Sequence, residues 1–375
     1  MEPPIKDTAQ TPASPYTRVA VLGAGSWGTA LATVIARNGH DVALWARRPD
    51  QAQAINETRQ NADYLDGLSL PARITATSDL AVALDDAQAV LLVTPSSTLR
   101  AMCQAIAPHI PDLIPLALAC KGVEKRTGLL LSEVVSDELP GHTVGAVSGP
   151  TFARETALDH PTAATVAFPF SYADRLSPDR SPAARMALTL SGGGFRPYVS
   201  DDLVGVEVGG AVKNVIAIAC GIMSGAGFAE NTRAALITRG IDEMKLLATA
   251  LGGRRETVTG LSGAGDLTLT CSSTTSRNMS LGYQLGQGVP RPNCFEGRNT
   301  VVEGEVNAVS VTDLARRVGV PMPICETVNA VLHHGADIQE AFSALWARPI
   351  EAEPFALDLS FDHPAPQTLQ FGGTS

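Results

Sequence analysis

The sequence predicts an α/β fold, with a Rossmann-type, doubly wound N-terminal domain followed by an all-α C-terminal domain. Three observations lead to this prediction. Strand-like and helix-like segments alternate from residue 17 to about residue 200, which is typical of a parallel sheet covered by helices. A glycine-rich turn joins the first predicted strand to the first helix. Beyond residue 203, long helical patterns follow one another with no convincing strand between them.

Short β-rich runs bounded by turn residues mark the strands of the first domain. They cover residues 17–22, 41–46, 89–94, 114–120, 142–148 and 162–168. Helical patterns lie between most of them, the first of which ends at Gly39. The segment 169–195 mixes a helical pattern with proline-rich and glycine-rich sequence, so we expect part of it to be an insertion or loop.

The helical patterns of the second domain cover residues 203–223, 231–251, 276–287, 304–318, 324–333 and 337–346. The predicted division of the chain is therefore a disordered N-terminal tail (1–16), a Rossmann domain (17–202), an all-helical domain (203–348) and a C-terminal tail (349–375).

Composition restricts the class of ligand. With 28 basic and 38 acidic side chains the formal net charge is −10, which argues against a nucleic-acid or anionic-membrane binder. An anionic ligand therefore needs a local basic cluster. The six cysteines form no C-x-x-C pair and no metal-like spacing with the seven histidines, so no metal site is predicted and reduced thiols in a cytoplasmic protein are expected. The first sixteen residues lack the apolar core of a secretory signal.

The turn after the first strand carries Gly23, Gly25 and Gly28 in G-x-G-x-x-G spacing. Between a strand and a helix, this spacing indicates a dinucleotide site, with the pyrophosphate on the helix N-terminus. Ser26 and Trp27 would offer backbone N–H groups there. The alternative is a strand–turn–helix without a ligand.

The end of the second strand indicates which dinucleotide is bound. NAD sites usually place an acidic residue there, but this chain has Arg47 and Arg48. Two guanidiniums suit a 2′-phosphate, so NADP(H) is favoured and NAD(H) remains the other candidate. The alternative is a solvated surface pair.

Other predicted strands end in residues suited to a ligand, since open α/β sheets bind at the carboxyl ends of their strands. Lys121 places a cation there, and Gly149, Thr151 and Ala153 offer backbone groups and a hydroxyl. A strand-end lysine can equally be just exposed.

Lys213 is the single charge in the apolar stretch 208–226. On a helix it shares a face with Gly209, Gly210, Ile216 and Ala217, which predicts a hollow beside the ammonium, as a substrate needs. A structural lysine would more often be covered by large neighbours. A membrane span is the other alternative, and a buried core helix is favoured over it.

Asp266 follows a glycine turn, and Ser276, Arg277 and Asn278 begin a predicted helix. Helix caps would explain the aspartate and the serine. A guanidinium, a hydroxyl and helix N–H groups also make a good phosphate site.

These pieces together resemble the bacterial-type NAD(P)-dependent glycerol-3-phosphate dehydrogenases over about residues 18–348. The matching motifs, in the family's order, are GAGSWGTALA, ACKGVE, SGPTFARE, GGAVKNVIAIA, NTRAALITRG, GAGDLTLTC, SRN and VVEG. The segment 169–194 and both tails depart from the family and touch no motif.

The resemblance implies reduction of dihydroxyacetone phosphate to sn-glycerol 3-phosphate for phospholipid synthesis, in a cytoplasmic homodimer, with Lys213 as the catalytic proton donor or acceptor. Residues 17–202 would then bind NAD(P) and 203–348 the substrate. The implied cofactor contacts are Ser26, Trp27, Arg47, Arg48, Lys121, Ala153, Arg277, Val301 and Glu303. The implied substrate contacts are Lys121, Gly149, Thr151, Lys213, Asp266, Ser276, Arg277 and Asn278.

Two alternatives remain open from the residues. One is a 3-hydroxyacid or ketopantoate-type reductase with a catalytic lysine, because a carboxylate would also suit Arg277. The other is a non-catalytic NADP-sensing module, against which a Lys213–Asp266 pair argues.

Overall fold

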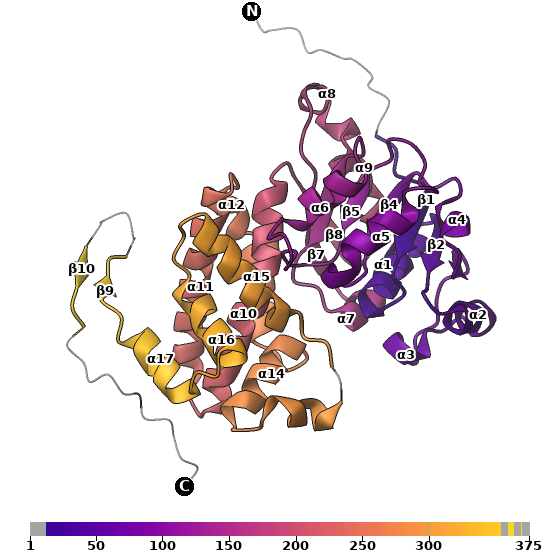
Figure 1. The fold of residues 1–375 in the computed structure, drawn as a ribbon. Helices are drawn as coiled ribbons and strands as arrows, with labels where there is room; N and C mark the ends of the chain where they lie inside the picture. Colours follow the sequence, from indigo (N-terminus) through magenta and orange to yellow (C-terminus); the bar gives the residue numbers. More distant parts are fainter. Residues whose placement is uncertain (1–12, 299, 354–358, 364–368, 370–375) are drawn as a thin grey trace, which may run out of the picture.

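The computed structural model describes residues 13–298, 300–353, 359–363 and 369 (Figure 1). An α/β half built on one large sheet comes first, and a cluster of helices around one long central helix follows it (Figure 1). This confirms the predicted fold class.

Eight strands form the large sheet, in the order β3-β2-β1-β4-β5-β6-β7-β8. The order reverses between β1 and β4, which creates the crevice where doubly wound sheets bind ligands. The bounds are β1 Arg18–Leu22, β2 Asp41–Trp45, β3 Ile74–Thr77, β4 Ala89–Leu92, β5 Leu116–Leu118, β6 Val144–Ser148, β7 Thr162–Ala167 and β8 Phe195–Ser200.

The sheet corrects the sequence prediction in three places. β3 and β8 were not predicted as strands, and both are edge strands. β3 has only four residues, and β8 contains Pro197, which edge strands tolerate and central strands do not. In addition, β7 pairs antiparallel with β6, so the sheet is mainly and not wholly parallel.

Helices cover both faces of the sheet (Figure 1). Successive residues of a strand point to opposite faces. Accordingly, Val19 and Val21 of β1 lie in one apolar cluster with Leu31, while Leu22 lies in another with Leu99. The helices of this half are α1 Ser26–Arg37, α2 Pro49–Thr58, α3 Ala62–Leu65, α4 Leu80–Leu84, α5 Leu99–Ile106, α6 Leu131–Glu138, α7 Ala153–Ala157, α8 Tyr172–Leu176 and α9 Pro182–Leu190. The last two occupy most of the predicted insertion.

α10, Leu203–Gly225, is the central helix of the second half. It is the one helix of the described ranges that is long and apolar enough to cross a membrane, but 94% of its apolar window is buried within the protein. Its neighbours are α11 Glu230–Ala250, α12 Arg255–Val258, α13 Asp266–Cys271, α14 Arg277–Gly286, α15 Glu303–Arg317, α16 Pro323–His333 and α17 Ile338–Trp346.

α10 and α14 pack with their backbones almost in contact. A Cβ on Gly282 of α14 would lie 2.1 Å from the carbonyl oxygen of Ile218 on α10. Such an approach is open only to glycine, because any side chain would separate the helices. Gly282 therefore fixes the position of α14, the helix that carries Arg277 and Asn278.

The connection between the two halves is short. Asp201 and Asp202 alone separate β8 from α10. The Asp202 carboxylate accepts hydrogen bonds from the backbone N–H of Gly205, at 2.9 Å, and of Arg254, at 2.8 Å. Asp202 thereby caps α10 and fixes it to the segment before α12.

Both predicted tails differ from expectation in part. Tyr16 is buried, its N–H donates to Thr189 Oγ1 at 2.8 Å, and the Arg185 guanidinium lies 4.1 Å from its ring centroid. The packed chain thus begins before residue 17. Near the other end, β9 Ile350–Glu351 pairs antiparallel with β10 Ser360–Phe361. The remainder of the predicted tails, residues 1–12, 354–358, 364–368 and 370–375, lies outside the described residues.

Candidate active site

The glycine turn between β1 and α1 has the geometry of a phosphate cradle. Gly23 has a φ of +127°, a conformation that favours glycine. A Cβ on Gly28 would lie 1.8 Å from the Gly23 carbonyl oxygen, so this glycine lets the helix pack on the turn. A Cβ on Gly25 would meet nothing within 4 Å, so the outer side of the turn is open.

The N-terminus of α1 suits a pyrophosphate. Gly25 precedes the helix and provides no side-chain cap, and the first turn holds no acidic residue. Its N–H groups are therefore available to an anion. Nearby, the Thr94 hydroxyl after β4 is buried with no hydrogen-bond partner among the described residues. The residues present fit a dinucleotide.

Trp27 connects this turn to a later strand end. Its ring packs against a small apolar cluster, Ala30, Leu65 and Ala157, which Ala153 also contacts. Ser26 Oγ donates to the carbonyl of Tyr64 at 3.2 Å. Three residues predicted at the cofactor site, Ser26, Trp27 and Ala153, therefore lie in one neighbourhood.

Arg47 and Arg48 lie just after β2, and both are exposed. Arg48 forms an ion pair with Asp63 of α3. Within the described part of the chain, Arg47 makes no hydrogen bond or ion pair. The second strand is followed directly by arginines, and the fold brings the Asp63 carboxylate to them from α3.

Two lysines from different halves of the molecule converge on one carboxylate. Lys213 Nζ on α10 donates to Asp266 Oδ1 at 2.5 Å, and Lys121 Nζ after β5 donates to Asp266 Oδ2 at 2.5 Å. Lys213 also donates to Thr270 Oγ1 at 2.9 Å, and that hydroxyl donates to the Asp266 carbonyl at 2.6 Å. Asp266 begins α13, and its side chain binds lysines and caps no helix end.

Burial and charge oppose each other at this cluster. Burial lowers the pKa of Lys213 to about 8, although the carboxylate of Asp266 acts in the opposite direction and Lys121 lowers it further. Burial would raise the pKa of Asp266, but the two ammoniums hold it below its usual value. Lys213 is therefore an ammonium that can release its proton within reach of neutral pH.

The space beside Gly209 and Gly210 is partly occupied by other parts of the protein. A Cβ on Gly210 would lie 3.2 Å from Lys121 Cγ, and one on Gly209 would lie 2.7 Å from the Ser262 carbonyl oxygen. The small residues of α10 thus admit the aliphatic chain of Lys121 and a backbone segment. The sequence alone does not show which neighbour a glycine admits.

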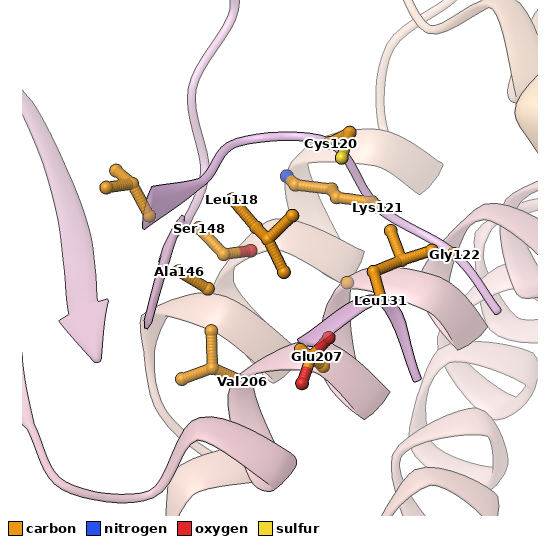
Figure 2. A pocket seen from close by; sticks show the side chains of 11 residues that line it. Leu118, Cys120, Lys121, Gly122, Leu131, Ala146, Ser148, Val206 and Glu207 are labelled. Atoms are coloured by element: carbon orange, nitrogen blue, oxygen red, sulfur yellow. The ribbon is translucent and has the colours of Figure 1, made fainter. Parts of the chain in front are cut away.

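A cavity of about 10 Å³ remains beneath Lys121 (Figure 2). Its polar wall includes Ser148, whose buried hydroxyl has no partner among the described residues, and Glu207 of α10. The Glu207 carboxylate accepts hydrogen bonds from the Ser132 N–H at 2.9 Å and from the Ser132 hydroxyl at 2.5 Å. Burial raises the pKa of the Glu207 carboxyl to about 7. The cavity is at the lower limit of the space that one water needs.

The residues predicted to bind the substrate phosphate lie at the start of α14. Ser276 caps the helix by accepting from the Met279 N–H at 3.3 Å. Asn278 is buried, with Nδ2 donating to Asn214 Oδ1 at 2.9 Å and Oδ1 accepting from the Gly304 N–H at 2.9 Å. Arg277 between them is exposed and has no ion pair within the described ranges.

The other residues predicted for the site differ in how closely the structure connects them to the cluster of Lys121, Lys213 and Asp266. Thr151 Oγ1 donates to the Gly149 carbonyl at 3.2 Å, next to Pro150, which faces the Gly265 turn before Asp266. Glu303 accepts from Asn214 at 3.3 Å. Val301 is 60% exposed.

Three further residues of this site were not predicted from the sequence. Thr270 lies one helical turn beyond Asp266, a spacing that could have revealed it. Asn214 directly follows Lys213 and joins Asn278 to Glu303. Asp63 gave no local signal, because its contact with Arg48 depends on the path of the chain between β2 and β3.

Comparison with protein families divides the chain at the same place as the fold. The family model described as NAD-dependent glycerol-3-phosphate dehydrogenase N-terminus matches residues 18–172. The corresponding C-terminus model matches residues 202–343.

Individual proteins agree with this result. A glycerol-3-phosphate dehydrogenase [NAD(P)+] of Rhodospirillum rubrum is 46% identical over 335 residues, covering 89% of this chain and 93% of that protein. The crystal structure of glycerol-3-phosphate dehydrogenase from Coxiella burnetii is 38% identical, with a TM-score of 0.82, and covers 89% of this chain and 99% of its own. A ketopantoate reductase from Ralstonia eutropha, 19% identical with a TM-score of 0.54 over 84% of this chain and 97% of its own, shares the fold alone.

Proposed function

This chain belongs to the NAD-dependent glycerol-3-phosphate dehydrogenase family, and we propose that Lys213 carries the proton transfer of its reaction. The enzyme reduces dihydroxyacetone phosphate with NAD(P)H to sn-glycerol 3-phosphate, reversibly. The observation that carries the proposal is the convergence of Lys213 and Lys121 on the buried carboxylate of Asp266.

Lys213 donates a hydrogen bond to the C2 carbonyl oxygen of the substrate and stabilises the negative charge that develops there. It then transfers its proton to that oxygen. In the oxidation direction the neutral amine accepts the same proton. When bound, the nicotinamide supplies the hydride for C2.

Asp266 and Thr270 position the ammonium, since Lys213 donates to both. Asp266 also opposes the loss of charge that burial would cause. Because the carboxylate is held between two ammoniums, it stays ionised and does not take the proton meant for the substrate.

The substrate phosphate and hydroxyls are assigned to the surrounding groups. Arg277 is exposed and offers a planar guanidinium. Ser276 uses its lone pair to cap α14 and keeps its O–H to donate. Asn278 keeps one amide hydrogen beyond the one given to Asn214. Lys121, Gly149 and Thr151 complete the substrate side.

The cofactor is assigned to the glycine turn, with Ser26, Trp27 and Ala153 around it. Four residues nearer the substrate complete the cofactor contacts: Lys121, Arg277, Val301 and Glu303. Arg47 and Arg48 are assigned to the 2′-phosphate, so NADP(H) is favoured over NAD(H). Residues 17–202 form the proposed NAD(P)-binding domain and 203–348 the proposed substrate and catalytic domain. A cytoplasmic homodimer that supplies phospholipid synthesis is proposed on family membership alone.

A spectrophotometric assay tests the reaction. We expect oxidation of NADPH, and more weakly of NADH, on addition of dihydroxyacetone phosphate. 2-Ketopantoate serves as the competing substrate, because it presents a carboxylate in place of the phosphate. Faster turnover of 2-ketopantoate would make the chain a ketopantoate-type reductase, and absence of any turnover would favour a cofactor-sensing module.

A further inference from the structure

We propose that Asp63 sets the balance between NADP(H) and NAD(H) by competing with the 2′-phosphate for Arg48. The inference rests on the proposed role of Arg48 as a 2′-phosphate ligand, and it assigns the opposing role to a residue outside the predicted site. The sequence places two arginines directly after the second strand, and the structure adds the carboxylate of Asp63 beside them.

The contact itself is direct. Arg48 directly precedes α2 at the end of β2, and its Nη2 donates to Asp63 Oδ2. Both side chains are partly exposed, at 47% for Arg48 and 60% for Asp63, so a bound ligand can reach either. Arg47 beside them has no such partner in the described ranges, so the pair engages one of the two arginines.

The carboxylate is held at this place by the glycine turn. Asn61, two residues before Asp63, is buried and donates to the Ala24 carbonyl at 3.0 Å and to Thr29 Oγ1 at 2.8 Å. Gln51 donates to the same Ala24 carbonyl at 2.8 Å. The one-turn helix α3 is therefore attached to the cofactor turn, and Asp63 keeps its position relative to the cofactor when Arg48 moves.

Competition follows from charge. A 2′-phosphate must separate Arg48 from Asp63 and then lie beside the carboxylate, which repels it. The 2′-hydroxyl of NAD(H) needs no guanidinium, and a carboxylate accepts its hydrogen bond. Asp63 thus weakens binding of the phosphorylated cofactor and leaves the unphosphorylated one unaffected or better bound.

The test uses fragments that lack the nicotinamide, so that binding is measured apart from catalysis. For the variant Asp63→Asn, calorimetric titration should give a Kd for 2′,5′-ADP lower by about three- to tenfold, since it frees an exposed ion pair and removes a repulsion. The Kd for 5′-ADP should stay equal or rise. An equal gain for both fragments, or none for 2′,5′-ADP, would overturn the proposal.

Asp50→Asn is the matched control. Asp50 is exposed in the first turn of α2 and carries the same charge near Arg48 without pairing with it. If this variant gained as much as Asp63→Asn, general electrostatics would replace the ion pair as the explanation. Arg48→Ala separates the two proposals. If this variant binds 2′,5′-ADP normally, the role of Arg48 is refuted. If Arg48→Ala binds it more weakly while Asp63→Asn leaves its Kd unchanged, only the role of Asp63 is refuted.

Discussion

Lys121 of the sheet domain and Asp266 of the helical domain are joined by an Nζ–Oδ2 hydrogen bond of 2.5 Å. The same carboxylate holds Lys213 through its other oxygen. The Lys213 ammonium and the sheet domain are therefore linked through one side chain. A change at either end of this link alters the charge that the other end experiences.

Replacing Lys213 by Met should lower kcat by about 10²–10⁴-fold, since general-acid help is lost. Stability should change little, because a buried cation and its desolvation are removed together and Asp266 keeps Lys121 as a partner. Turnover is measured by steady-state kinetics and stability by the Tm. The double variant with Asp266→Asn should recover no activity and should be less stable than the single variant, because Lys121 then loses its carboxylate partner. A lower Tm with near-normal kcat would show that Lys213 is structural.

The pH profile should report Lys213. Its pKa is about 8, so the protonated form that reduction requires is lost as pH rises through that value. The kcat/KM of reduction should therefore fall above about pH 8, whereas the kcat/KM of glycerol 3-phosphate oxidation should rise toward it. Lys121→Met removes a neighbouring positive charge that lowers this pKa, so the midpoints of both profiles should move to higher pH. Profiles unchanged by this variant would contradict the assignment.

Arg277→Lys keeps the positive charge but loses the planar guanidinium that can donate two parallel hydrogen bonds to a phosphate. We expect the KM for dihydroxyacetone phosphate to rise by about tenfold with a smaller change in kcat, which corresponds to about 1.4 kcal/mol of lost hydrogen bonding. Arg298→Lys is the control, because Arg298 is exposed and pairs with Glu296. A normal KM in the Arg277 variant would remove this residue from the substrate site and leave it to the cofactor or to structure.

Replacing Arg47 and Arg48 together by Ala should raise the KM for NADPH by one to two orders of magnitude, since about 1–3 kcal/mol of charged hydrogen bonding is removed. NADH lacks the 2′-phosphate, so its KM should change much less. The ratio of the two KM values is the measurement. Equal losses for both cofactors would mean that these arginines do not discriminate between them.

Gly282→Ala tests the contact between α10 and α14. Its Cβ would lie 2.1 Å from the Ile218 carbonyl, so the helices must separate, and we expect a loss of about 1–3 kcal/mol of unfolding free energy. Gln287→Ala, at the exposed end of α14, is the control and should be nearly neutral. Denaturant unfolding of the two variants measures the difference. An unchanged midpoint for Gly282→Ala would show that the contact can relax at little cost.

Strong local patterns allowed most elements to be predicted from the sequence. α10 was identified by its long apolar pattern, and the β1–α1 turn by glycine spacing inside a strand–helix context. β3 and β8 were missed because these edge strands bury few apolar side chains and leave a weak pattern. The antiparallel direction of β7 leaves no mark in composition, since it depends on how the chain crosses the sheet.

Within the site, sequence reasoning identified residue types better than their partners. The pairing of Lys213 with Asp266 was anticipated, but the second bond from Lys121 and the filling of the space beside Gly210 were not. Those contacts depend on how the two domains dock. Asp63 shows the same limit, because its partner lies fifteen positions away across a loop and a helix.

The two-residue connection between β8 and α10 also limits how the domains can move. Asp201 and Asp202 span about 7 Å even when fully extended, so the end of β8 and the start of α10 cannot move far apart. After any opening, Lys121 returns to Asp266 as an intramolecular event at high effective concentration. Closing of the site is therefore a unimolecular step, and its rate should not depend on protein concentration.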